Sequence, residues 1–196
     1  MRKWILALKI IWRLIMQPSG SYFIVVEEVC KKELYKHPND IYSIWLLSNH
    51  YVRYKKFHEA QVLLESLVEL DGNRKSVILL LSKVYFKLGK YEKVVELLIN
   101  LEKLAAKDPE NYYIGYSLIE MGRFEEAIKY LDRYVHHYAK DYVPFVRLGY
   151  AYYMEERYDL AMEAYIKANK LNPSEKEIKK SIEICKEKLK ARAGHC

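Results

Sequence analysis

The sequence predicts an all-α solenoid of antiparallel helix pairs, and an internal repeat is the main reason. Four segments recur in which an aromatic residue is followed three positions later by alanine or valine, the aromatic residues being Phe57, Tyr91, Phe124 and Tyr158. These residues are 34, 33 and 34 positions apart, a period typical of stacked supersecondary units. Seven Gly and five Pro are too few for a many-stranded sandwich or barrel, and the runs rich in Leu, Glu, Lys and Ala favour helix.

Each repeat is predicted to contain two amphipathic helices joined by a short turn. Apolar residues follow helical spacing on both sides of turns marked by Gly89 or Gly122, or by the polar stretches 55–56 and 155–157. Small residues let the paired backbones approach closely: Ser48, Ser82, Gly115 and Gly149 on the first helices, and Ala60, Val94, Ala127 and Ala161 on the second. Large residues then fill the space between successive pairs, namely Tyr51, Leu64, Tyr85, Leu98, Leu131, Tyr152 and Tyr165.

This pattern resembles the tetratricopeptide-repeat (TPR) family, whose motif has the same order of large, small, aromatic, alanine and terminal proline residues. The match is best in residues 142–175, where all eight motif sites are filled: Phe145, Leu148, Gly149, Tyr152, Ala161, Tyr165, Ala168 and Pro173. The sequence departs from the motif at Val94 and Tyr134, which occupy sites that are usually small. The resemblance implies a right-handed superhelical solenoid with repeats at 41–74, 75–107, 108–141 and 142–175.

Two further segments flank the four repeats. Residues 1–40 are predicted to form a degenerate helix pair, because His37-Pro38 stands where a repeat should end and Pro18-Ser19-Gly20 would end a first helix. Residues 176–196 are predicted to form a capping helix and tail. Ile178, Ile182, Cys185 and Leu189 lie on one helical face there, and solenoids need such a cap to cover the last apolar surface.

The amino-terminal helix over residues 2–17 has three alternative interpretations. Arg2, Lys9 and Arg13 fall in a narrow helical stripe, while Trp4, Ile5, Leu8, Ile11, Trp12 and Ile15 occupy the broad remainder. The first interpretation is that this helix is the first helix of the degenerate pair. The second is a basic interfacial helix on an anionic membrane, and the third is a signal-like segment. Lys9 and Arg13 interrupt the apolar core that a signal peptide requires, which argues against the third interpretation. No run of eighteen uninterrupted apolar residues exists, which removes an ordinary transmembrane helix.

Function is expected on the inner surface of the array, which first helices line in the family that the sequence resembles. The inward-facing residues implied by this resemblance form a groove of cations and phenols: Asn49, Arg53, Lys83, Lys87, Tyr112, Tyr116, Arg147, Tyr150 and Tyr153. Aromatic rings supply rigid contact area and Lys or Arg pairs with carboxylates, so an extended or helical peptide with acidic residues is the expected guest. The alternative is a solvated face with tyrosines packed between helices.

No catalytic, metal or cofactor site is expected, and the chain is predicted not to be an enzyme. His136 and His137 are neighbours on a helix, so their side chains point about 100° apart and cannot share one ion. No phosphate-binding, dinucleotide-binding, zinc-protease or nucleophile-elbow motif occurs. Three cysteines without CxxC spacing indicate neither a disulfide framework nor a zinc knuckle, which favours a reducing, cytoplasmic location.

The charge distribution argues against nucleic acid as a partner. Residues 1–20 carry four basic and no acidic residues, and residues 174–196 carry seven basic and four acidic ones. The formal net charge is +7, and residues 21–173 therefore contain 22 basic and 22 acidic residues. A basic face along the whole molecule is thus disfavoured. The sequence thus predicts a scaffold that binds a protein or peptide, with self-association and a peripheral membrane contact through residues 2–17 as open alternatives.

Overall fold

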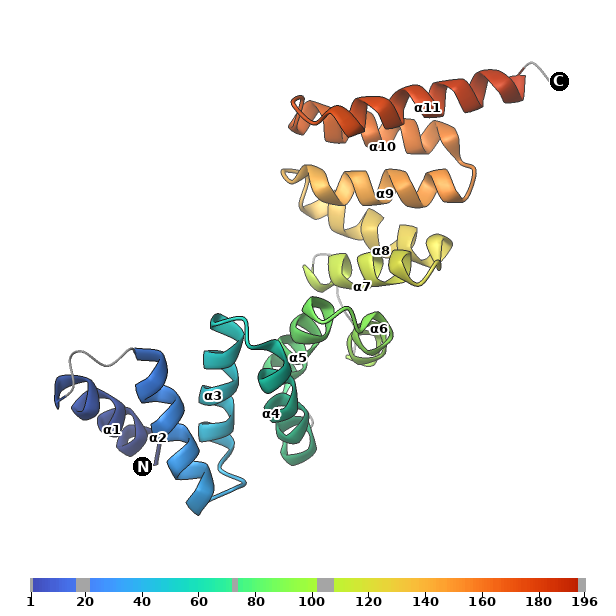
Figure 1. The fold of residues 1–196 in the computed structure, drawn as a ribbon. Coiled ribbons are helices and arrows are strands. Elements are labelled where there is room, and N and C mark those ends of the chain that lie inside the picture. Colours follow the sequence, from blue (N-terminus) through green and yellow to red (C-terminus); the bar gives the residue numbers. More distant parts are fainter. Residues whose placement is uncertain (1, 17–21, 72–73, 102–107, 194–196) are drawn as a thin grey trace. The chain divides into compact units, whose positions relative to one another are not determined.

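The chain folds into α-helices in the part that its computed structural model describes, which is residues 2–16, 22–71, 74–101 and 108–193. These residues contain eleven helices and no strand, so the predicted all-α class is confirmed (Figure 1). The predicted turn at 18–20 and the tail residues 195–196 lie outside the described residues.

The chain divides into two compact units, residues 1–90 and 91–196. Unit 1 contains α1 (Arg2–Met16), α2 (Tyr22–Lys36), α3 (Ile41–Arg53), α4 (Phe57–Leu70) and α5 (Lys75–Lys87). Unit 2 contains α6 (Tyr91–Ile99), α7 (Glu110–Glu120), α8 (Phe124–His137), α9 (Tyr142–Met154), α10 (Tyr158–Leu171) and α11 (Lys176–Ala193). The division falls inside the predicted repeat 75–107, whose first helix belongs to unit 1 and whose second helix begins unit 2.

Local signals explain where several helices begin and turn. The carboxylate of Asp40 accepts a hydrogen bond from the Ser43 amide at 2.9 Å and caps α3, and Asp141 caps α9 in the same way. The tight turns within the four predicted repeats each place one residue in the left-handed region, with φ between 55° and 73° at Lys55, Gly89, Gly122 and Glu156. Only glycine adopts this conformation without steric strain. The turns at Lys55 and Glu156 are therefore strained versions of the glycine turns.

The small residues lie where neighbouring helices meet. Ala60, Val94, Ala127 and Ala161 are completely inaccessible to solvent. A Cβ atom added to Gly115 would lie 2.6 Å from Cγ of Leu131, and one added to Gly149 would lie 2.9 Å from the ring of Tyr165. Val94, which stands where the repeat motif usually has a smaller residue, is also fully buried. Close backbone approach therefore fixes which faces of the paired helices meet.

A tyrosine–carboxylate hydrogen bond joins successive helix pairs at three places. The hydroxyl of Tyr51 on α3 donates to Glu27 on α2 at 3.0 Å. Tyr85 on α5 donates to Glu65 on α4 at 2.6 Å, and Tyr152 on α9 donates to Asp132 on α8 at 3.0 Å. These tyrosine rings fill the space between helix pairs. The carboxylate satisfies the hydrogen-bonding capacity of each tyrosine hydroxyl at the rim of the core.

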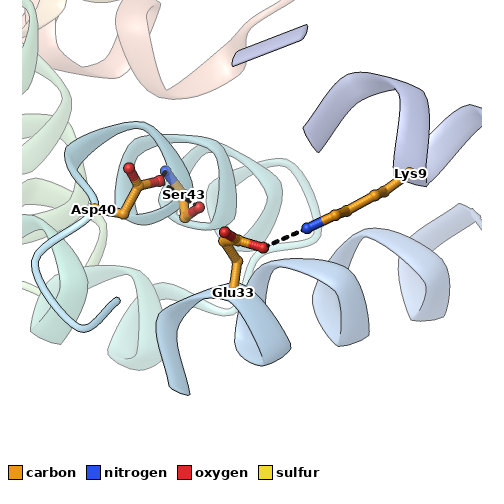
Figure 2. Close-up of polar contacts among 4 residues, drawn as sticks. All are labelled: Lys9, Glu33, Asp40 and Ser43. Atoms are coloured by element: carbon orange, nitrogen blue, oxygen red, sulfur yellow. Dashed lines mark hydrogen bonds and ion pairs between the residues drawn. The ribbon is translucent and has the colours of Figure 1, made fainter. Parts of the chain in front are cut away.

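The amino-terminal helix α1 packs on α2 by one face only. Leu6 and Ile10 are buried, and Nζ of Lys9 lies 2.7 Å from a carboxylate oxygen of Glu33 on α2 (Figure 2). On the other side Ile5, Leu8, Ile11 and Trp12 are 48–65% exposed. Within the described residues, no helix has both the length and the apolar character that crossing a bilayer requires.

Candidate partner-binding site

In unit 1, the predicted groove residues lie on the first helices α3 and α5. Asn49 is half-buried, and its side-chain amide donates to the carbonyl oxygen of Trp45 at 2.8 Å. Arg53, Lys83 and Lys87 are exposed, and none of the three forms an ion pair with another described residue. The Asn49 side chain thus bonds within its own helix, whereas the three cations are available to carboxylates of another molecule.

In unit 2, the predicted groove residues lie on α7 and α9, which contact each other directly. Tyr112 and Tyr116 are half-buried on α7, and Arg147 is half-buried on α9. The guanidinium carbon of Arg147 stands 4.3 Å from the centre of the Tyr116 ring, and Nη2 donates to the Tyr116 hydroxyl at 3.0 Å. A cation over a ring face that also donates to the ring's hydroxyl holds both side chains in one geometry.

Arg147 has a second partner, which sequence reasoning missed. Its Nη1 lies 3.7 Å from a carboxylate oxygen of Glu120 on α7, and both side chains are about one-third exposed. Glu120 follows Tyr116 by four residues and therefore lies on the same face of the helix. That spacing does not indicate which residue of another helix meets Glu120. Because Arg147 is already paired, a partner carboxylate would have to compete with Glu120 for it.

Tyr116 belongs to a larger group of rings, which we call the tyrosine cluster. Its ring centre lies 6.0 Å from that of Tyr112 and 6.1 Å from that of Tyr91 on α6. Tyr112 continues the contact to Tyr134 on α8 at 5.3 Å, and Tyr134 stacks on Tyr138 at 4.6 Å. Burial raises the pKa of Tyr112 to about 12, opposed by the nearby charge of Arg147. The Tyr112 hydroxyl therefore stays protonated across the physiological range.

The remaining two predicted residues lie in separate aromatic pairs. Tyr150, which is 40% exposed, meets Phe124 edge-on with ring centres 5.9 Å apart. Tyr153 lies 5.4 Å from Tyr158 at the start of α10. The structure thus brings Tyr112, Tyr116 and Arg147 together, and it places Tyr150 and Tyr153 elsewhere on α9.

A cleft of about 350 Å³ lies between α9 and α11 beside Arg147. Val143, Val146 and Ile178 give it an apolar lining, and the charged residues Arg147, Glu175 and Glu177 line it as well. Its volume lies at the lower end of the range of about 300–1,000 Å³ for ligand pockets, which is room for one or two side chains of a peptide. The unit 2 site therefore combines a ring surface, a paired cation and an apolar cleft.

The histidine pair and the buried cysteines show no arrangement for chemistry. The rings of His136 and His137 are 5.1 Å apart and nearly perpendicular. No group of three or more His, Cys, Asp or Glu residues is placed to hold a metal ion in the described part of the chain. Burial raises the pKa of the Cys30 thiol to about 12, so it stays protonated and unreactive near neutral pH.

Comparisons with known proteins agree with this architecture. Three profiles described as tetratricopeptide repeat match residues 51–114, 111–141 and 144–175. Among solved structures, MamA AMB-1 is 20% identical with a TM-score of 0.72, over 86% of this chain and 99% of that one. MamA MSR-1 is 18% identical with a TM-score of 0.71, over 85% and 96% of the two chains.

A MamA segment from Desulfovibrio magneticus RS-1 is 20% identical with a TM-score of 0.65, over 78% of this chain and 93% of that one. At these identities the likeness to MamA concerns the fold alone. No curated protein matches the chain by sequence. The three repeat profiles together cover more than half of the chain, and the helix pairs occupy the matched ranges. The chain therefore belongs to the tetratricopeptide-repeat family, a family of protein–protein interaction scaffolds.

Proposed function

We propose that the chain binds a peptide segment of a partner protein on the exposed faces of its first helices. The observation that carries this proposal is the contact of Arg147 with Tyr116 and the tyrosine cluster in unit 2. Rings that are held in place before binding offer contact area without losing rotamer entropy when the partner arrives. Tyrosine and arginine are also the residue types that carry most binding energy in protein interfaces.

The two units favour different parts of a partner. In unit 1 the exposed Lys83 and Lys87 suit acidic side chains, as the sequence predicts. In unit 2 the carboxylate of Glu120 pairs with Arg147, and Glu175 and Glu177 line the cleft beside it. Apolar or aromatic partner residues therefore suit that face and its cleft better than acidic ones. We therefore expect a partner segment with separate acidic and apolar stretches.

The proposal is tested with short peptides selected by display on the full chain, whose affinities are then measured across ionic strength. Tyr116→Ala should weaken binding at all salt concentrations, because it removes contact area. Lys83→Glu with Lys87→Glu should slow association and make the remaining affinity less salt-sensitive, while stability changes by about 0.5 kcal/mol or less. A matched control is Lys188→Glu with Lys190→Glu on α11. The control should bind like the wild type. If Tyr116→Ala and the Lys83 and Lys87 variant also bind like the wild type, the partner site lies elsewhere.

A peripheral membrane adaptor is the second candidate function, and the exposed face of α1 favours it. The apolar row of Ile5, Leu8, Ile11 and Trp12 is 48–65% exposed. Residues 1–20 carry four basic residues and no acidic one. An apolar row combined with basic charge is the composition of helices that lie in a membrane interface. In this function α1 would hold the chain at the membrane while the repeats recruit a partner.

Cell fractionation separates the two candidate functions. The full chain is compared with a chain that lacks residues 1–20, and both are checked for folding by circular dichroism. A membrane adaptor would move from the membrane fraction to the soluble fraction on truncation. If both chains stay soluble, the adaptor function is ruled out and the scaffold function is unaffected.

A further inference from the structure

The edge formed by α1 and α2 contains a small cleft with an unusual charge. The cleft has a volume of about 290 Å³ and is lined by Lys9 and Trp12 from α1 and by Val29, Lys32, Glu33 and Lys36 from α2. Three basic side chains and one acidic side chain therefore line the cleft. Val29 and the indole of Trp12 supply the apolar part of the lining.

The charges of this cleft are not equally available. Lys9 and Glu33 neutralise each other through their 2.7 Å contact (Figure 2), and that contact lowers the pKa of the Glu33 carboxyl. Lys32 and Lys36 are exposed, and neither pairs with another described residue. They are four residues apart and so lie on the same face of α2. The cleft thus offers, beside an apolar lining, two ammonium groups that no described residue pairs.

The exposed apolar row of α1 adjoins the cleft through Trp12, which is 65% exposed. An outer face of this kind is not a general property of the chain. On α11, the other terminal helix, the exposed residues are mostly Lys and Glu, and Ile178, Ile182 and Cys185 are buried. The α1–α2 edge therefore presents apolar contact area and unpaired positive charge side by side.

We propose that this edge binds the surface of an anionic phospholipid bilayer, with the lipid phosphate at Lys32 and Lys36 and the apolar row of α1 at the boundary between the headgroups and the acyl chains. The proposal rests on the adaptor function and names its lipid class and its headgroup site. Fifteen helical residues span about 22 Å, which is less than the hydrocarbon thickness of about 30 Å. The helix therefore lies in the plane of the interface, where tryptophan is favoured.

Vesicle flotation of the full chain tests the proposal. Vesicles of pure phosphatidylcholine are compared with vesicles of three parts phosphatidylcholine to one part phosphatidylglycerol. Each basic residue near an anionic surface contributes about 1 kcal/mol, so Lys32→Gln with Lys36→Gln should weaken binding to the anionic vesicles about 30-fold. The matched control, Lys188→Gln with Lys190→Gln on α11, should bind like the wild type.

A second pair of variants tests the apolar row. Trp12→Gln should weaken binding to both kinds of vesicle, and Val62→Gln on α4 is its control because Val62 is also 65% exposed. Circular dichroism of each variant establishes that it is folded. Brominated acyl chains should quench tryptophan fluorescence in the wild type and less in the Trp12→Gln variant.

The outcomes separate this proposal from the adaptor function on which it rests. Equal binding to neutral and anionic vesicles, unchanged by the Lys32 and Lys36 substitutions, overturns the headgroup site and leaves the adaptor function standing. No binding to either vesicle overturns both. A lipid-free dimer that Leu8→Gln dissociates would show that a second copy of the chain covers the row, and it also overturns the proposal.

Discussion

Replacing Gly149 by alanine tests the close helix approach that fixes the repeat register. A Cβ atom at this position would lie 2.9 Å from both Cδ1 and Cε1 of Tyr165 and 3.1 Å from its Cγ. Ordinary carbon contacts are about 3.5–4.0 Å. The Tyr165 ring is only 5% exposed and is enclosed by neighbouring helices. Either the ring or the backbone of α9 must therefore move.

Two opposing effects set the expected magnitude. Alanine is better than glycine in a helix interior by about 1 kcal/mol, whereas overpacking a core costs about 1–3 kcal/mol. We expect Gly149→Ala to lower the free energy of unfolding by about 1 kcal/mol, which lowers the melting temperature by about 2–4 °C in a chain of this size. Gly115→Ala should destabilise at least as much, because its Cβ atom would lie 2.6 Å from Cγ of Leu131.

Urea and thermal unfolding followed by far-ultraviolet circular dichroism measure both effects. Tyr165→Ala supplies the control background, because it removes the three atoms that lie nearest to the new methyl group. In that background Gly149→Ala should stabilise by about 1 kcal/mol through helix propensity alone. A higher melting temperature for Gly149→Ala in the wild-type background would refute the steric argument and the register built on it.

Three further changes have expected outcomes. Gly122→Ala should destabilise by about 1 kcal/mol, because φ is +73° at this residue although no atom would clash with the added Cβ. Lys55→Gly should stabilise by up to about 1 kcal/mol, because glycine relieves the same backbone strain. Urea unfolding measures both changes. Burial and then Asp132 raise the pKa of Tyr152 to about 12, above the unfolded value of about 10. Its stabilising contribution is therefore complete below about pH 10 and is lost as pH rises towards 12, which alkaline melts compared with Tyr152→Phe would show. Deleting residues 176–193 should keep the remaining helices but cause aggregation through the uncovered apolar face, and light scattering that stays flat would contradict the capping role.

The helix pairs were predictable because their signals are local or periodic. The spacing of Phe57, Tyr91, Phe124 and Tyr158 fixes the period, and the small residues mark the helix contacts. The tyrosine–carboxylate bonds were not predictable in this way. Tyr51 meets a carboxylate 24 residues earlier, whereas Tyr85 and Tyr152 meet one 20 residues earlier. Partners on different helices depend on the packed geometry and not on spacing within one helix.

The candidate site shows the same limit. Family resemblance implied that Arg147, Tyr112 and Tyr116 share a face, and in unit 2 they do meet. It did not indicate that Glu120 holds Arg147, because an ion pair between helices depends on how α7 and α9 pack. The φ of +55° at Glu156 was also not predictable from the sequence. Polar residues are common in turns, and their presence does not specify a left-handed backbone.

Site-specific photo-crosslinking tests the central claim that partners bind the faces of the first helices. The display-selected peptide is mixed with full chains that carry p-benzoylphenylalanine at Tyr150 on α9 or, as a control, at Arg133 on α8. Both positions are exposed, so the probe reaches solvent in each case. Our account predicts crosslinks from position 150 that mass spectrometry locates in the peptide, and few from position 133. Crosslinking from position 133 with none from position 150 would contradict it.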